Sequence, residues 1–375
     1  MAPTDITRTV NNVPESKFEA VQTVMPVTVT DPRQIRQVLA VTKPIASANF
    51  TGCLNIILCY NKATENDSGF IVAGWIRESL ARALTEQPLL AGRLRRGEDG
   101  GGELEIVSND SGVRLVEASN SLSLKEFIDF KGREKAAAES QLVFWKSIDE
   151  QNPQFSPLFY VQVTNFECGG YSIGISCSIL LADLVIMDKF LQTWAKIQCD
   201  MLSKNEDSNL PIFYLPNLKP SSPSLNGILS STPIDNFGQT MIFNISKENM
   251  ILEEESSKKL ALLCIQEAEQ NLGTKMSLHE FNFLVKETTK VIKVENCKKN
   301  EIVNFNLERH FKSSCANLKE YLKMSELAFR EGNKAIRVSC WIGSVSDGFV
   351  LGIPSHEEVT SDFNIIITFP IENLN

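Results

Sequence analysis

Hydrophobic and polar positions follow two patterns along the chain, which separate expected strands from expected helices. Continuous or alternating apolar runs predict strands at residues 20–30, 53–61, 104–107, 113–117, 158–166, 171–179, 336–343 and 363–369. Apolar positions spaced by three or four residues predict helices at residues 70–84, 122–130, 136–145, 183–197, 253–272, 278–289 and 318–329. Strands and helices are therefore expected to mix along the whole chain.

The most organised stretch covers residues 155–197. Two apolar runs flank a turn at Cys168-Gly169-Gly170, and a helical pattern begins at Asp183. This order predicts a β-hairpin that leads directly into a helix.

Composition changes between residues 207 and 240. Few periodic apolar positions occur there, and serines mix with five prolines, Pro211, Pro216, Pro220, Pro223 and Pro233. Such a stretch predicts an extended crossover. Because 375 residues exceed what one core usually serves, we expect two domains, at residues 1–206 and 241–375, joined by the crossover.

Charge and cysteine usage exclude several classes of function. The net charge of −9, without a stripe of lysine or arginine, argues against nucleic-acid binding. The nine cysteines include no C-x-x-C pair, so neither a zinc site nor a disulfide framework is expected, and no other metal site is indicated.

No targeting or membrane-spanning segment is predicted. The N-terminal residues are polar and lack an apolar signal region. The longest apolar run, residues 171–187, is short and is interrupted by Asp183, which argues against a transmembrane helix. A cytoplasmic protein with reduced thiols is the expectation.

Several segments resemble the plant BAHD acyltransferases, which transfer acyl groups from CoA thioesters to alcohols and amines. Residues 155–197 resemble the segment that carries the family's H-x-x-x-D motif, and residues 88–94 (PLLAGRL) are similar to its P-x-x-A-G-R run. Residues 104–117 and 241–249 resemble strands of the first domain and the start of the second. The resemblance implies an α/β (α+β) fold of two chloramphenicol-acetyltransferase-like domains, with mixed sheets flanked by helices and a substrate channel between them.

The second half departs from the family pattern. No counterpart of the family's G-x-F-G-N loop is present, so the second domain is expected to be shortened. The glycine-rich residues 98–103 are flanked by carboxylates and lack the G-K-[ST] ending of a phosphate-binding loop, which favours a hairpin turn.

The first signature motif lacks its histidine. With Asp183 at the motif aspartate, Ile179 occupies the position of the residue that takes the acceptor's proton in the family. A positioned base typically contributes on the order of 10²–10⁴-fold in rate, and isoleucine cannot act as one. Slipping the register places Ser178 at that position but Ala182 at the aspartate. Cys177 and Ser178 could act as nucleophiles only beside an activating base, and buried strand positions are the favoured interpretation.

The second signature motif, D-F-G-W-G, is also altered. Residues 348–354 (GFVLGIP) keep Phe349 and Gly352 but not the aspartate or the tryptophan. The resemblance implies that these two residues support the far wall of the channel and that Ile179, Ser178 and Cys177 line it. Asp183 is expected to keep a structural role, with an arginine as its partner.

The three histidines of the chain do not restore the base. His279, His310 and His356 lie in polar or turn-like contexts, which are typical of surface residues.

The sequence of residues 155–176 is similar to that of the eceriferum/Glossy branch of the family, whose members are associated with very-long-chain fatty acid elongation and wax. This implies a protein that binds an acyl-CoA or an elongase condensing enzyme, with a peripheral location at the endoplasmic reticulum and no other cofactor. Alternatives stay open: an active enzyme that works without the histidine, by a lyase-type reaction or by acyl transfer to an alcohol or to a deprotonated amine, and a relic with little function. If the chain is an enzyme, it is expected to be an acyltransferase that transfers groups other than aminoacyl groups.

Overall fold

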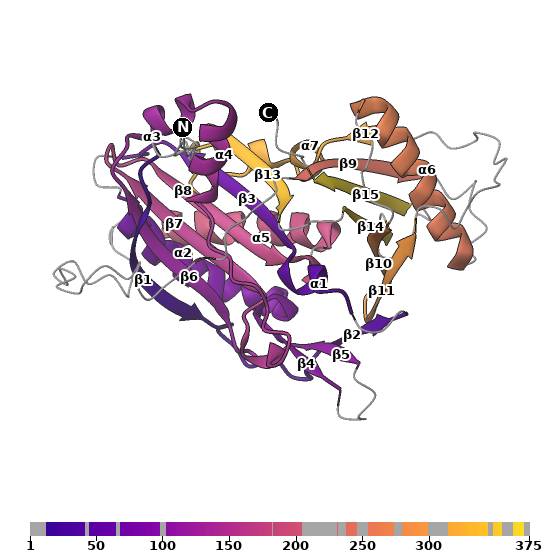
Figure 1. The fold of residues 1–375 in the computed structure, drawn as a ribbon. Helices are drawn as coiled ribbons and strands as arrows, with labels where there is room; N and C mark the ends of the chain where they lie inside the picture. Colours follow the sequence, from indigo (N-terminus) through magenta and orange to yellow (C-terminus); the bar gives the residue numbers. More distant parts are fainter. Residues whose placement is uncertain are drawn as a thin grey trace, which may run out of the picture.

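The computed structural model describes residues 13–41, 45–64, 68–97, 103–181, 183–204, 231, 238–245, 254–273, 280–298, 314–343, 348–354 and 363–370. These residues form two sheets with helices on their faces, so the mixed α/β class is confirmed (Figure 1).

The first sheet contains six strands in the order β1 (Lys17–Val24), β6 (Val113–Asn120), β7 (Phe159–Phe166), β8 (Tyr171–Ser178), β3 (Cys53–Tyr60) and β13 (Arg337–Gly343). The second sheet contains nine, in the order β12 (Ser314–Ala316), β9 (Gly238–Ile245), β15 (Phe363–Pro370), β14 (Phe349–Pro354), β10 (Glu280–Thr288), β11 (Val291–Lys298), β2 (Ile35–Ala40), β5 (Leu104–Val107) and β4 (Arg93–Arg96). Both sheets are mixed, since β6 and β7 run parallel, as do β10 and β14.

The described α-helices are α1 (Ala48–Thr51), α2 (Gly69–Glu86), α3 (Leu124–Asp129), α4 (Gly132–Ser140), α5 (Leu184–Lys204), α6 (Glu254–Leu272) and α7 (Leu318–Tyr321). Short 3₁₀ turns lie at η1 (Pro88–Ala91), η2 (Pro153–Phe155), η3 (Ile179–Leu181) and η7 (Met324–Glu326).

Strand β3 shows how the first sheet is buried on both faces. Its even-numbered side chains, such as Leu54 and Leu58, share a core with α2 and α5. Its odd-numbered side chains, such as Ile57, pack with α3, α4 and Trp145 on the other face. A strand with two buried faces is mostly apolar, as predicted for residues 53–61, and Asn55 is a buried polar residue of this strand.

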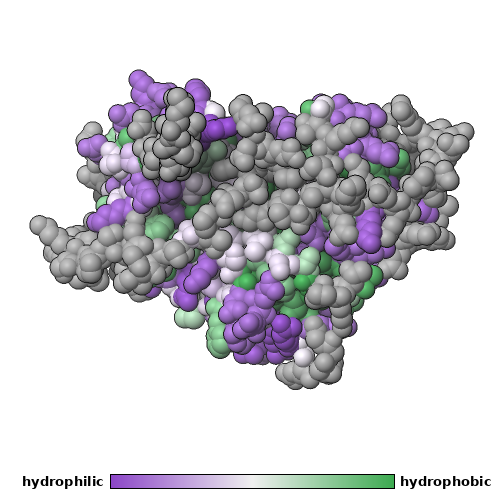
Figure 2. All heavy atoms as spheres, in the orientation of Figure 1, coloured by the Kyte–Doolittle hydropathy of each residue, from purple (hydrophilic) through white to green (hydrophobic). Residues whose placement is uncertain are grey.

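The second sheet is covered by α6 on one side, at the right edge of Figure 1. Its other side joins the core of α2 and α5 through Leu284, Ile292 and Leu351, so the two sheets share one hydrophobic core. On the face shown in Figure 2, hydrophilic side chains gather around the tip formed by β4 and β5, and a hydrophobic area lies above them.

The sheets exchange strands between the two halves of the chain. Strand β13 comes from the second half but pairs with β3 in the first sheet. Strands β2, β4 and β5 come from the first half but extend the second sheet. The proposed division at residues 206 and 241 stays a prediction, and most of the predicted crossover lies outside the described residues.

Residues 278–289 were predicted as a helix, and this prediction was wrong, because residues 280–288 form strand β10 (Glu280–Thr288). Phe281 and Phe283 pack on the side of α6, whereas the next residue, Leu284, points to the other face and packs into the shared core. With both faces buried, apolar side chains occur close together and imitate helical spacing.

Three other predicted elements are shorter than expected. The predicted helix at 318–329 contains a single turn, α7, followed by η7, and the predicted helix at 136–145 ends at Ser140. The predicted strand at 20–30 ends at Val24, shortly before Pro26, which has no N–H to donate to a neighbouring strand.

The hairpin, turn and strand predictions elsewhere agree with the structure. Strands β7 and β8 pair antiparallel and lead into α5. Strands β4 and β5 also pair antiparallel, which fits the predicted hairpin, although residues 98–102 lie outside the described residues.

Candidate functional site

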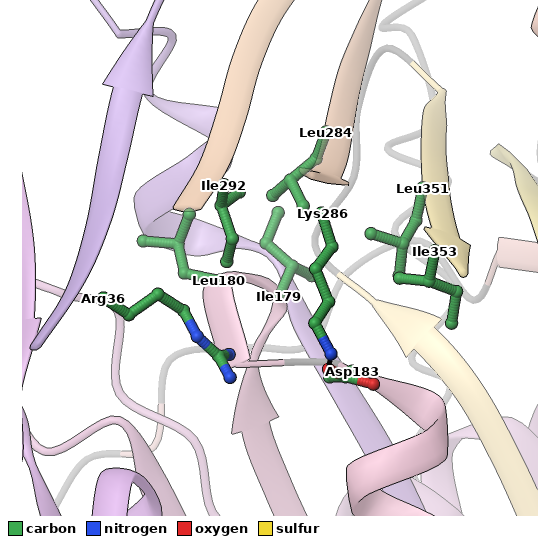
Figure 3. A pocket seen from close by; sticks show the side chains of 9 residues that line it. All are labelled: Arg36, Ile179, Leu180, Asp183, Leu284, Lys286, Ile292, Leu351 and Ile353. Carbon is green, nitrogen blue, oxygen red and sulfur yellow. Dashed lines mark hydrogen bonds and ion pairs between the residues drawn. The ribbon is translucent and has the colours of Figure 1, made fainter. Parts of the chain in front are cut away.

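A small cavity lies where β8 passes through η3 into α5, facing the second sheet (Figure 3). Ile179, in the turn η3 that follows β8, lies in one wall of the cavity, and Leu284 and Leu351 of the second sheet lie in the opposite wall. The complete lining consists of Arg36, Ile179, Leu180, Asp183, Leu284, Lys286, Ile292, Leu351 and Ile353. The site is thus built between segments that are distant in the sequence.

Asp183 directly precedes α5, and its carboxylate contacts two other residues. One carboxylate oxygen accepts a hydrogen bond from the Ile186 N–H at 3.3 Å, which caps the helix. The other forms a buried ion pair with the Lys286 ammonium group of β10. A negative charge at a helix N-terminus is also favoured by the helix dipole. The partner of Asp183 is therefore a lysine, and the expected arginine was wrong.

Ile179 lies in the position that the resemblance assigns to the histidine. It is buried, and its N–H donates to the Gly52 carbonyl oxygen at 3.2 Å. A methyl group added at Gly52 would lie 2.8 Å from Cδ1 of Ile179, so this glycine provides the room that the isoleucine fills. Nothing in this side chain can accept a proton.

Cys177 and Ser178 are the last residues of β8, and both are fully buried. The Ser178 hydroxyl accepts a hydrogen bond from the Leu180 N–H at 3.3 Å. Burial raises the pKa of the Cys177 thiol, which keeps it protonated at neutral pH. Neither side chain is among the residues that line the cavity.

Phe349 and Gly352 lie on opposite faces of β14. Phe349 belongs to the shared core, in the same row as Leu351 and Ile353, but only the latter two line the cavity. Gly352 faces the other way, where an added Cβ would lie 2.7 Å from the Phe363 ring. Their assignment to a channel wall stays a prediction.

Two cations in the cavity wall were not identified from the sequence. Arg36 and Lys286 are 3% and 7% exposed, and each is the one basic residue among the buried side chains on its face of the strand. A single basic residue among apolar neighbours is a sequence signal that could have identified them. The Arg36 guanidinium donates to the Thr289 carbonyl oxygen at 3.1 Å. Lys286 was missed because its segment was interpreted as a helix.

The cavity itself is small. The space open to the centre of a water-sized sphere is about 10 Å³, which is close to the minimum for one water molecule. A ligand at this position would have to displace side chains of the lining.

The remaining predicted residues can be placed only in part. His279, His310 and His356 all lie outside the described residues. Within the described ranges, no group of histidine, cysteine, aspartate and glutamate side chains could hold a metal ion. No helix in those ranges is sufficiently long and apolar to cross a bilayer.

The family is decided by a sequence comparison. The family model described as Transferase family matches residues 47–310, which is more than half of the chain. The chain belongs to this family, the BAHD acyltransferases. The recognition from sequence motifs is thereby confirmed.

Curated relatives match the chain over limited stretches. Protein ECERIFERUM 26-like of Arabidopsis thaliana is 29% identical over 159 residues, 41% of this chain and 36% of that protein. Hydroxycinnamoyl-CoA:piscidic acid hydroxycinnamoyltransferase of Actaea racemosa is 37% identical over 123 residues, 32% of this chain and 26% of that protein. Rosmarinate synthase of Plectranthus scutellarioides is 34% identical over 133 residues, 36% of this chain and 29% of that protein. The matches thus span between about a quarter and a little over a third of the relatives' length.

Solved structures are similar over most of the chain at low sequence identity. The crystal structure of vinorine synthase has a TM-score of 0.47 and 15% identity, covering 95% of this chain and 94% of that one. F. graminearum TRI101 complexed with ethyl coenzyme A has a TM-score of 0.42 and 12% identity, covering 90% and 95%.

Proposed function

We propose that this BAHD-family chain binds an acyl-CoA without transferring its acyl group by the family's histidine mechanism. The observation that carries the proposal is the pair of positions Ile179 and Asp183. The aspartate keeps its structural role at the start of α5, whereas the position of the base holds a buried aliphatic side chain. A chain that keeps the family's scaffold but has no base at this position is expected to bind an acyl-CoA and not to transfer its acyl group.

The charged groups in the cavity wall support this proposal. The carboxylate of Asp183 is engaged by Lys286 and by the helix start, so it is not available to take a proton from an acceptor. Lys286 is held by the same buried ion pair, so its side chain is already engaged. The burial and pKa of Cys177 also argue against a covalent acyl intermediate.

The relatives support the ligand class. One is named for hydroxycinnamoyl-CoA as its acyl donor, which makes a CoA thioester the ligand we propose for this chain. Two of the matched proteins carry the ECERIFERUM 26 name, and they support the finer proposal of an elongase-type partner in very-long-chain fatty acid or wax metabolism.

A second candidate is an active enzyme that works without the motif histidine. The relatives named as transferases, such as the hydroxycinnamoyltransferase of Actaea racemosa, favour it. Orientation of bound groups alone can supply several kcal/mol of a barrier, and an amine acceptor that is already deprotonated needs no base. A lyase-type reaction, in which the substrate's own groups exchange the proton, belongs to the same candidate.

A direct test combines binding and turnover on the purified chain. We expect saturable binding of acetyl-, hydroxycinnamoyl- or long-chain acyl-CoA by calorimetry, without release of free CoA when an alcohol or amine is added. Chromatography should measure the free CoA, because the exposed Cys168 would react with thiol reagents. Acceptor-dependent CoA release by the unaltered chain would overturn the proposal in favour of the second candidate.

Restoring the base provides the matched variant. If the site still binds both substrates, Ile179→His should raise acceptor-dependent CoA release by on the order of 10²–10⁴-fold. Ile179→Asn introduces polarity without a base and should not raise the release of CoA.

The proposed partner is tested separately. Co-expression with an elongase condensing enzyme should lengthen the acyl products, and unchanged chain lengths would count against such a partner.

A further inference from the structure

A tyrosine and an asparagine from different elements form a hydrogen-bonded pair near the cavity. Tyr321 ends α7, and Asn364 lies in β15. The Asn364 side-chain amide donates to the Tyr321 hydroxyl oxygen at 3.0 Å. Asn364 is only 1% exposed, whereas Tyr321 is partly exposed. The pair therefore connects a buried amide to a side chain that solvent can reach.

Two observations place the pair beside the cavity that contains Asp183. Asn364 is directly opposite Ile353 in the antiparallel pairing of β14 and β15, and opposed side chains share a face of the sheet. Ile353 lines the cavity. Burial, followed by the carboxylates of Asp183 and Asp188, raises the pKa of Tyr321, so these carboxylates are near the phenol and its proton is retained at neutral pH.

The pair has unused hydrogen-bonding capacity. The Oδ1 atom of Asn364 is buried and has no partner among the residues that the structure describes. Exchanging the amide nitrogen and oxygen would let Oδ1 accept the phenol proton but would leave the nitrogen unpartnered instead. Because a buried polar atom without a partner is costly, a hydrogen-bond donor that reaches Oδ1 would be favoured there.

We propose that Tyr321 and Asn364 form a subsite that binds one neutral hydroxyl group of a small-molecule ligand. A hydroxyl oxygen can accept the Tyr321 O–H while its own proton is donated to Asn364 Oδ1, which matches the two unused functions of the pair. The nearby carboxylate of Asp188 disfavours an anionic ligand group in the same place. The inference deepens the proposed function by assigning residues that select the ligand, but its test needs no CoA ester.

The chemical test uses a matched pair of fragments, benzyl alcohol and benzyl methyl ether, titrated into the full chain and followed by NMR. We expect the alcohol to bind roughly fivefold more tightly than the ether, because the ether cannot donate a hydrogen bond. Tyr321→Phe and Asn364→Leu should each remove this preference. Equal binding of the two fragments, or binding of neither, would overturn the inference without affecting acyl-CoA binding.

A stability measurement separates a ligand subsite from a purely structural contact. Asn364→Leu removes a buried oxygen that has no described partner, together with one hydrogen bond to a tyrosine hydroxyl that solvent can reach, so its thermal midpoint should be unchanged or higher. Thr368→Val is the control, because it removes a side-chain hydrogen bond between β15 and β9 at 3.0 Å, and it should lower the midpoint without changing the fragment preference. A lowered midpoint for Asn364→Leu, comparable with the control, would show that the pair serves only the fold.

Discussion

At the scale of single residues, the ion pair of Asp183 and Lys286 connects α5 to β10 across 103 positions of the sequence. Both side chains are almost completely buried. Two charges removed from water gain stability from each other only while both are present. The pair therefore makes the start of α5 dependent on the second sheet, and it fixes the aspartate in its structural role.

Removing one charge should be much more costly than removing both. We expect Lys286→Met or Asp183→Asn to lower the free energy of unfolding by about 3–5 kcal/mol, because each variant leaves the other charged group buried without its partner. The double variant should lose clearly less than the sum. Urea unfolding at pH 7 measures these differences.

The neighbouring strand provides a matched control. Lys293 of β11 pairs with Glu287 at 2.7 Å, and both side chains are partly exposed. Lys293→Met should cost less than about 1 kcal/mol, since solvent screens an exposed pair. A similar loss for Lys286→Met would show that the buried pair does not stabilise the fold in this way.

At the scale of elements, the segment PLLAGR connects η1 and β4 to the turn before β6. The guanidinium of Arg93 donates to the carbonyl oxygens of Gly92 and Gly112 at 2.8 Å and of Ser111 at 3.1 Å. An added Cβ at Gly92 would lie 2.4 Å from the Val107 carbonyl oxygen, so only glycine permits this approach. The segment PLLAGR thus has a structural role in this chain, because it fixes β4 to the turn before β6.

Arg93 should not be replaceable by lysine. Burial, followed by the charge of Arg114, lowers the pKa of Arg93 to about 10, and the group therefore stays protonated at neutral pH. An ammonium group lacks the planar fork that reaches three carbonyls, so Arg93→Lys should cost about 2–4 kcal/mol in urea unfolding. Arg95→Lys on the same strand, where Glu105 forms a half-exposed pair, should cost less than about 1 kcal/mol. Equal losses of unfolding free energy for the two variants would contradict the structural role of Arg93.

At the scale of the whole molecule, the exchange of strands makes each sheet depend on both halves of the chain. Strand β3 is buried along its entire length between β8 and β13. Strand β11 likewise pairs with β2 from the first half. A boundary drawn through the predicted crossover would therefore leave an apolar strand edge on each side, which promotes aggregation.

Separate fragments of residues 1–206 and 241–375 are consequently expected not to fold alone. Each should aggregate or lack cooperative unfolding, whereas co-expression should give a soluble complex. Size-exclusion chromatography and thermal unfolding by near-UV circular dichroism provide the measurement. A monomeric fragment 1–206 with a cooperative transition would show that the first domain is independent of β13.

The sequence by itself determined the features that depend on neighbouring residues. The hairpin around Gly169, the helix that follows Asp183 and the apolar strand at residues 53–61 were predicted from local period and turn chemistry, and the structure contains them. The family and the position of Ile179 relative to Asp183 also follow from the order of residues alone.

Only the tertiary structure decided the features that depend on distant partners. Residues 280–288 form a strand whose two faces are buried from Phe281 to Leu284, and Lys286 rather than an arginine pairs with Asp183 because β10 lies opposite the start of α5. The position of β13 beside β3 and the pairing of Tyr321 with Asn364 have no local signal either. Local patterns fix the type of an element, but burial and pairing between residues distant in the sequence determine which side chains come into contact. The site is built from such contacts.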